Sequence, residues 1–126
     1  MTSSQFDTVR NLLLEIGAEE LHHGDCVGSD VDAHRIARDL CLRVVIHPPS
    51  NPAQRAFCEA SRVYALLPYL ERNHRIVDQS DVLIATPDSE GEKRRSGTWA
   101  TIRYARKHER RVFVVCPHGS VLEGQR

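Results

Sequence analysis

Three short segments of this 126-residue chain carry polar groups suited to binding an anion or a sugar, and each lies at the start of a predicted helix. The first is the loop from Gly24 to Asp30, which also contains Asp25, Gly28 and Ser29. Glycines let backbone N–H groups approach a ligand, and the helix N-terminus that follows favours negative charge. The aspartates argue against bare phosphate and fit ribose hydroxyls better. Two interpretations stay open: a ligand loop, or a capped turn without a ligand.

The second segment runs from Arg94 to Thr98 and opens the predicted helix that contains Trp99. Backbone amides, the hydroxyls of Ser96 and Thr98, and two guanidinium groups next to Gly97 would together form a cradle for phosphate. Serine and threonine at the start of a helix also simply cap it, so the local sequence favours neither interpretation.

The third segment carries Arg72 and Asn73, near the start of the helix that precedes the third predicted strand. Both side chains are able to bind a phosphate group or the edge of a base. Taken alone, such a pair is more typical of a solvated helix face.

The histidines and cysteines do not predict a metal centre. Adjacent residues on a strand point to opposite faces, so His22 and His23 do not easily bind one ion. No C-x-x-C pair occurs, which argues against a zinc knuckle, and a cytosolic chain does not favour disulfides. We therefore expect no metal, no cofactor and reduced thiols at all four cysteines, which are Cys26, Cys41, Cys58 and Cys116.

Predicted strands alternate with predicted helices along the whole chain, which is typical of a parallel sheet covered on both faces. Loops at the carboxyl ends of such strands are where ligands bind, and the three polar segments fall there. The sequence predicts one domain over residues 1–126 with a polar tail over 118–126. The expected helices are 2–16, 30–40, 52–63, 69–79 and one that begins at Gly97 and carries Trp99, Ile102 and Ala105 on one face. The expected strands are 18–23, 43–47, 82–86 and 112–116.

Charge and hydropathy exclude several classes of protein. The 17 basic and 17 acidic side chains cancel, which argues against a nucleic-acid-coating surface. Eight of the basic groups lie between Lys93 and Arg111, which fits a local anion site. No apolar run approaches the roughly 18 residues of a membrane span. The segment from Met1 to Asp7 lacks the features of a signal peptide, so we expect a cytoplasmic protein.

The loop His23-Gly24-Asp25-Cys26-Val27-Gly28-Ser29-Asp30 resembles the H-G-x-x-x-G-A-D loop of the SLOG superfamily of Rossmann-like nucleotide-binding proteins. This superfamily includes the Lonely Guy phosphoribohydrolases and DNA-processing proteins. Further along the chain, Arg72 lies nine residues before Asp81, and Gly97-Thr98 opens a helix, as in the family. The resemblance implies a three-layer Rossmann-like domain that binds a nucleotide or nucleotide-derived ligand, with Arg72 as the candidate catalytic arginine.

Two departures from the family pattern modify this expectation. The hydrolases carry a glutamate where this chain has Thr101, which favours binding over N-glycosidic hydrolysis of a nucleoside monophosphate. That hydrolysis stays open as the alternative if a carboxylate is supplied by Asp25, Glu90 or Glu92. The family also has a strand before its first helix, so we expect a sheet of about four strands that lacks it.

The resemblance also implies a homodimer, because relatives pair through their helices. The aromatic side chains that would anchor such an interface are Tyr64, Trp99 and Tyr104.

Overall fold

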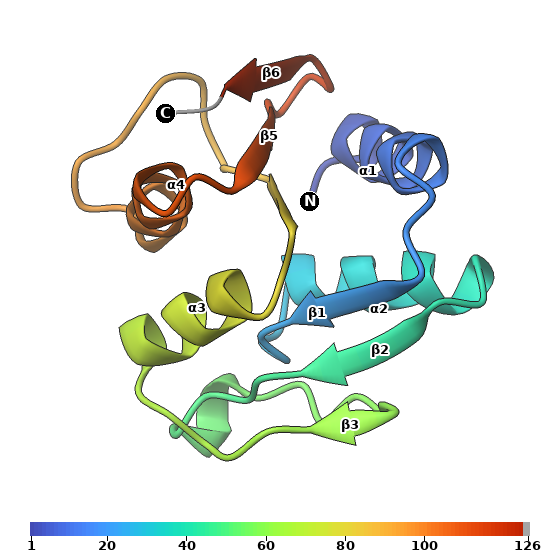
Figure 1. The fold of residues 1–126 in the computed structure, drawn as a ribbon, viewed down its shortest axis with the longest axis vertical. Coiled ribbons are helices and arrows are strands. Elements are labelled where there is room, and N and C mark those ends of the chain that lie inside the picture. The colour runs from blue at the N-terminus through green and yellow to red at the C-terminus, as the bar shows by residue number, and fades with distance from the viewer. Residues whose placement is uncertain (125–126) are drawn as a thin grey trace.

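The computed structural model describes residues 1–124 and is a mixed α/β structure with two small sheets (Figure 1). Four α-helices accompany six strands, and Asn51 caps a single 3-10 turn over Pro52–Gln54. The helices are α1 (Ser3–Glu15), α2 (Ser29–Asp39), α3 (Tyr69–Asp78) and α4 (Gly97–Lys107). The strands are β1 (Glu20–His23), β2 (Arg43–Ile46), β3 (Arg62–Val63), β4 (Val82–Ala85), β5 (Arg111–Val115) and β6 (Val121–Gly124).

Helix α1 begins where its local signals predict. The Thr2 hydroxyl accepts the Gln5 N–H at 3.0 Å and the Gln5 side chain accepts the Thr2 N–H at 2.9 Å, which completes a capping box. The buried Gln5 amide also donates to the carbonyls of Pro87 and Val115, at 2.8 and 3.0 Å. The start of α1 is thereby tied to the chain just after β4 and to the end of β5.

The strands form two sheets where one parallel sheet of about four strands was expected. Strands β1, β2 and β3 are parallel, while β4 and β5 are parallel and β6 joins β5 antiparallel. The four expected strands form from the expected segments, but no backbone pairing joins β1 to β4 among the described residues. The single-sheet prediction was therefore wrong: no segment of residues 1–124 lies between the two inner edges.

Two local predictions were also wrong. Part of the supposed polar tail forms β6, because Gly119, at φ +97°, turns the chain back after β5. The Cys116 N–H then bonds the Ser120 carbonyl at 2.8 Å. The supposed helix over 52–63 ends after one 3-10 turn, since the chain is extended at Arg55 and takes φ +59° at Phe57.

The helices cover β5 from two sides. Apolar residues of α1 and α2 pack with Phe113 and Val115, whereas those of α3 and α4 pack with Val112 and Val114. Successive strand residues point to opposite faces, so this division follows from the period of two. Within residues 1–124, no helix has the length and apolar character needed to cross a membrane.

The aromatic residues expected at a dimer interface make contacts within the protomer. Trp99 is 6% exposed and belongs to the core between α3, α4 and the second sheet. Tyr104 stacks on His74 and donates to Asp78 at 2.8 Å, and Tyr64 stacks on His47. These side chains stabilise the protomer itself.

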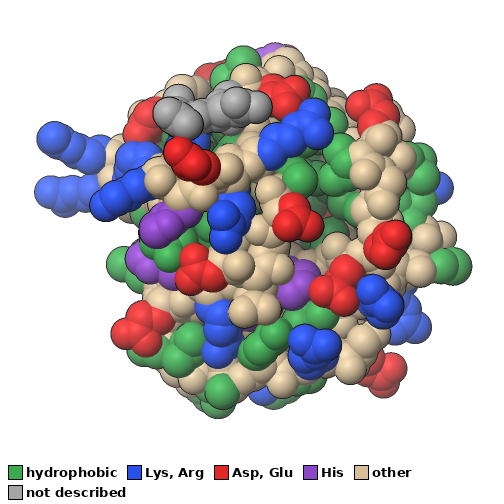
Figure 2. Space-filling view, viewed as in Figure 1, with side chains coloured by type: hydrophobic (Ala, Val, Ile, Leu, Met, Phe, Trp, Pro, Cys, Tyr) green, Lys and Arg blue, Asp and Glu red, His purple; other side chains and the backbone are tan. Residues whose placement is uncertain are grey.

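Charged side chains of both signs are interspersed over the face shown in Figure 2, with basic groups gathered over α4 and the loop before it. Two of the basic groups in this region already hold carboxylates: Lys93 pairs with Asp88 at 3.3 Å, and Arg103 with Glu92 at 2.6 Å. Acidic residues of the loop before α4 therefore partly neutralise this basic region.

Candidate functional site

A pocket of about 360 Å³ lies where β1 and β4 end, and most of the predicted ligand residues line it. The loop after β1 meets α3 and the start of α4 there, although these segments are far apart in the sequence. The predicted residues that the fold brings together are Gly24, Ser29, Asp30, Arg72, Asn73 and Thr98. Their convergence follows from parallel strands placing their carboxyl ends at one edge.

Arg72 is the main charged group of this pocket and is only 2% exposed. Its guanidinium donates through Nη1 to the Gly24 carbonyl and, at 3.3 Å, to the His47 carbonyl, while Nε donates to Asn73 Oδ1 at 2.7 Å. Nη2 meets the Cys26 sulfur at 3.6 Å. No described carboxylate forms a salt bridge with Arg72.

Gly24 is required by the close approach of this arginine. A Cβ atom at position 24 would lie 2.3 Å from Arg72 Nη1 and 2.6 Å from its Cζ. Any side chain there would displace the guanidinium. The glycine that the sequence assigned to ligand binding therefore acts by admitting Arg72.

Two helix N-termini face the pocket. Helix α2 begins at Gly28, which provides no side-chain cap, and Ser29 and Asp30 of its first turn line the pocket. The Asp30 carboxylate accepts the Cys26 N–H at 3.0 Å. Helix α4 presents Thr98 in its first turn. The first N–H groups of a helix favour an anion, although the Ser96 hydroxyl already accepts one of those of α4 and the first turn of α2 carries Asp30 and Asp32.

Four of the predicted ligand residues do not line the pocket. Asp25 is fully buried, and its carboxylate pairs with Arg55 Nε and accepts the Cys58 N–H, each at 2.9 Å. Gly28 starts α2, and the Ser96 hydroxyl caps α4 by accepting the Trp99 N–H. Gly97 lies under a ring, because a Cβ there would be 2.1 Å from the Tyr69 hydroxyl.

The sequence did not single out the apolar part of the pocket. Tyr69 and Ile76 of α3 line it together with the last residues of β4 and the Thr86 that follows. The Tyr69 ring also lies 5.2 Å from the Arg72 guanidinium carbon, a cation–π contact. Leu83, Ile84 and Ala85 could have been predicted to line the pocket, because they end a predicted strand and ligands bind at the carboxyl ends of parallel strands.

Beneath the pocket, a chain of hydrogen bonds connects Arg75 to Glu20 through two histidines. Arg75 Nε donates to His47 Nδ1 at 3.1 Å, His47 Nε2 meets His22 Nδ1 at 2.8 Å, and His22 Nε2 meets Glu20 Oε1 at 2.7 Å. Since Arg75 is always a donor, His47 accepts at Nδ1 and carries its proton on Nε2. His47 is thus held neutral.

Acidification is expected to destabilise the protein before its carboxylates titrate. Burial, followed by the charges of His22 and Arg75, lowers the pKa of His47 to about 3, and burial also lowers the pKa of His23 and His34. A histidine whose pKa falls from about 6.5 on folding contributes stability that is complete above pH 6.5 and lost as the pH falls toward the folded value. We expect about 1–2 kcal/mol from His47 to be lost between pH 7 and pH 5.

Urea denaturation at the two pH values measures this loss. His47→Gln keeps a polar side chain without a titrating ring, so the stability of this variant should fall less on acidification. An equal fall in the two proteins would contradict the assignment to His47. Burial raises the pKa of Asp25, but bonds from Cys58 and Arg55 outweigh it and lower the pKa overall. Asp25 therefore affects stability only below about pH 3.9, outside the range from pH 7 to pH 5.

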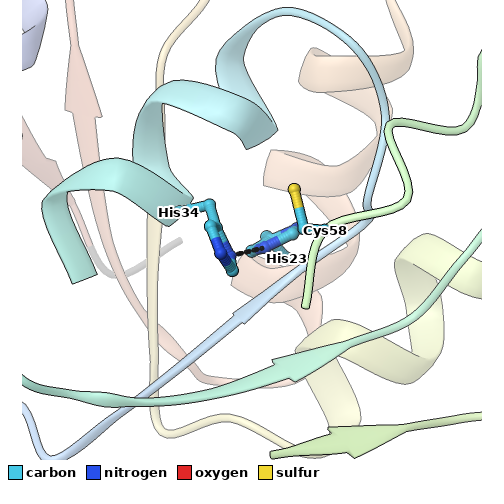
Figure 3. A group of neighbouring side chains, drawn as sticks. All are labelled: His23, His34 and Cys58. Carbon is cyan, nitrogen blue, oxygen red and sulfur yellow. Dashed lines mark hydrogen bonds between the residues drawn. The ribbon is translucent and has the colours of Figure 1, made fainter. Parts of the chain in front are cut away.

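His23, His34 and Cys58 place one potential metal ligand each within 4.8 Å of one another (Figure 3). His23 Nδ1 accepts the Asp25 N–H at 2.9 Å, so the proton of the neutral ring is on Nε2, which meets His34 Nδ1 at 3.1 Å. Burial and a hydrogen bond to Asp25 raise the pKa of Cys58 to about 11, so its thiol stays protonated. In the structure the two rings and the neighbouring Asp25 and Cys58 form a hydrogen-bonded network.

Comparison with known proteins finds no matching family model, no similar curated protein and no similar solved structure.

Proposed function

We propose that the protein binds a nucleotide or a nucleotide-derived phosphate ligand in the pocket at the ends of β1 and β4. The observation that carries the proposal is Arg72, a buried guanidinium beside the pocket with no carboxylate partner among the described residues. Buried charges in proteins are paired, and an unpaired buried arginine favours an anionic ligand. Phosphate is the anion that the adjacent helix N-termini also favour.

The remaining pocket residues suit the sugar and the base. The Asp30 carboxylate and the Ser29 hydroxyl offer hydrogen bonds to ribose hydroxyls, and Tyr69, Ile76 and Leu83 provide apolar surface for a base. The pocket volume of about 360 Å³ is within the usual range for small-molecule sites. The sequence resemblance to the SLOG superfamily supports the same function, and with it a three-layer Rossmann-like arrangement.

Hydrolysis of the N-glycosidic bond is the second candidate, and Asp30 is the observation that favours it. This aspartate is the one carboxylate among the described residues that line the pocket. The other acids considered from the sequence bond elsewhere: Asp25 to Arg55, Glu90 to His118 and Glu92 to Arg103. The Thr101 hydroxyl donates to the Gly97 carbonyl at 2.9 Å and supplies no acid. Binding therefore ranks first.

Calorimetric titration tests the proposal with ribo- and deoxyribonucleoside 5′-monophosphates, the matching nucleosides and inorganic phosphate. We expect a monophosphate to bind at least about tenfold more tightly than its nucleoside, because only the phosphate meets Arg72. Equal affinity for the two, or no binding of any phosphate compound, would overturn the proposal.

Chromatography of the same mixtures for free base separates the two functions. Binding without base release supports a binding protein. Release that is lost in Asp30→Asn would establish hydrolysis.

A further inference from the structure

The turn between β5 and β6 carries a histidine that is hydrogen-bonded to a serine on one side and to a glutamate on the other. His118 Nε2 meets the Ser120 hydroxyl at 2.7 Å, and His118 Nδ1 meets Glu90 Oε1 at 2.5 Å. None of the three residues lines the nucleotide pocket. A hydroxyl on one ring nitrogen and a carboxylate on the other is the arrangement by which serine hydrolases activate their nucleophile.

The carboxylate decides which ring nitrogen of His118 carries the proton. An ionised carboxylate only accepts hydrogen bonds, so Glu90 requires the proton of the neutral ring on Nδ1. Nε2 then keeps its lone pair and accepts the O–H of Ser120. This is the tautomer that a general base beside a serine needs, because the base takes the hydroxyl proton as the oxygen attacks.

The order of the strands brings the three residues together. β4 and β5 are neighbouring parallel strands, so the chain leaves both of them at the same edge of the second sheet. Glu90 lies in the loop that follows β4, whereas His118 and Ser120 lie in the turn that follows β5. Glu90 and His118 are 28 positions apart in the chain, so no local sequence pattern connects them.

The backbone of the turn is held on both sides of His118. The Thr2 hydroxyl donates to the Pro117 carbonyl at 2.6 Å, and the Thr8 hydroxyl donates to the Gly119 carbonyl at 2.9 Å. A Cβ at Gly119 would lie 3.2 Å from Thr8 Oγ1, so the turn is in close contact with α1, beside which it lies in Figure 1. A reactive side chain on a fixed backbone keeps its geometry, as catalysis by a positioned base requires.

All three side chains are open to solvent, which limits the substrates that they suit. The side chains of His118 and Glu90 are each 62% exposed, and Ser120 is exposed as well. A site in contact with water stabilises the negative charge on an attacked carbonyl oxygen less than a closed one does. Aryl esters depend least on that stabilisation, because their leaving group is a stable anion. The exposure therefore favours this class of ester.

We propose that Ser120, His118 and Glu90 form a second site, which hydrolyses aryl esters of carboxylic acids. The Ser120 oxygen bonds to the acyl carbon while its proton passes to His118 Nε2. The bond to the aryl oxygen then breaks, the phenol leaves with that proton, and the acyl group remains as an ester of Ser120. Water attacks this ester, again through His118, and releases the carboxylic acid. Glu90 is a positioning residue that holds the Nδ1 proton of the ring.

A fluorophosphonate probe tests the nucleophile independently of nucleotide binding. The probe forms a bond between phosphorus and the serine oxygen and releases fluoride, while the hydroxyl proton passes to the histidine. We expect peptide mass spectrometry to find the label on Ser120 and not on the exposed Ser61. His118→Gln should slow the labelling at least about tenfold, whereas His108→Gln, also exposed, should not. Absence of the label from Ser120, or equal labelling in His118→Gln and the wild type, would overturn the proposal.

Hydrolysis of p-nitrophenyl acetate by the full chain tests the activity itself. We expect an acetyl group on Ser120 when the reaction is stopped with acid. Ser120→Ala should lower the rate of nitrophenol release at least about tenfold, and Ser61→Ala is the matched control with an unchanged rate. An unchanged rate in Ser120→Ala would show that the hydrolysis takes place elsewhere and would contradict the assignment.

Nitrogen NMR spectra of the imidazole rings test the role of Glu90, because they distinguish a protonated ring nitrogen from an unprotonated one. Comparison with His118→Gln assigns the signals of His118. The neutral ring of the wild type should carry its proton on Nδ1. Glu90→Ala removes the acceptor, so the ring should populate both tautomers and the labelling of Ser120 should slow at least about tenfold. Glu71→Ala, on the exposed face of α3, should change neither, and an unchanged tautomer in Glu90→Ala would refute the positioning role.

Discussion

Replacing Arg72 with lysine is expected to weaken the binding of a nucleoside 5′-monophosphate by about 10- to 100-fold. A hydrogen bond to a charged group contributes about 1.5–3 kcal/mol, and lysine has no second nitrogen with which to hold the pocket and the phosphate together. The side chain also holds the Gly24 and His47 carbonyls and Asn73 Oδ1, so the variant should lose about 2–4 kcal/mol of stability as well. Calorimetric titration and urea denaturation measure the two effects. Arg38→Lys, on the exposed face of α2, is the matched control and should change neither.

If Arg72→Lys is too unstable to titrate, Gly24→Ala provides a second test of the role of Arg72 in ligand affinity. The added methyl group meets the guanidinium and displaces it without removing its charge. Affinity for the monophosphate should fall by about tenfold or more, because the hydrogen bonds depend on geometry. Unchanged affinity in both variants would show that Arg72 is a structural group and that the ligand binds elsewhere.

Replacing Asp25 with alanine is expected to lower the free energy of unfolding by about 3–5 kcal/mol, the usual cost of breaking a buried ion pair. The substitution leaves Arg55 without its partner and the Cys58 N–H without its acceptor. Alanine is also strained at the φ of +52° that Asp25 adopts. Urea denaturation at pH 7 measures the loss, with Asp39→Asn on exposed α2 as the control.

The free energy of unfolding of Asp25→Asn should lie between those of the wild type and Asp25→Ala. Asparagine tolerates the left-handed backbone and keeps a hydrogen-bond acceptor, but it loses the charge. Folded Asp25→Asn should bind the monophosphate with unchanged affinity, since Asp25 does not line the pocket. A loss of affinity with no loss of stability would reverse this assignment and return Asp25 to the ligand site.

Local sequence predicted four of the helices and four of the strands, but it missed β3 and β6 and placed a helix over 52–63. The capping box at Thr2 and Gln5 and the apolar spacing of α1 act over one or two turns, so they are visible without a tertiary structure. Four strands were likewise evident as short apolar runs. The rule that ligands bind where parallel strands end then placed the Gly24–Asp30 loop, Arg72 and Thr98 near one another. The structure places all three at one pocket.

The role of each polar residue depends on contacts that the fold creates. Asp25 and Asp30 are equally good ligand candidates in the sequence. In the structure, Asp25 is buried in an ion pair with Arg55, whereas Asp30 lines the pocket. Gly97 resembled a phosphate-binding glycine, but the Tyr69 ring occupies its open side. Such roles depend on side chains 28 to 48 positions apart, which no local pattern connects.

The sequence also did not predict that the strands divide into two sheets. The apolar runs of β1 and β4 show that each forms a strand, but a strand's neighbours are set by long-range backbone pairing that leaves no local mark. Local patterns thus account for most of the elements and for the edge at which the pocket forms. Packing determined that Arg72 is buried with no salt bridge to a described carboxylate and that a cavity separates β1 from β4, because both follow from contacts between distant segments.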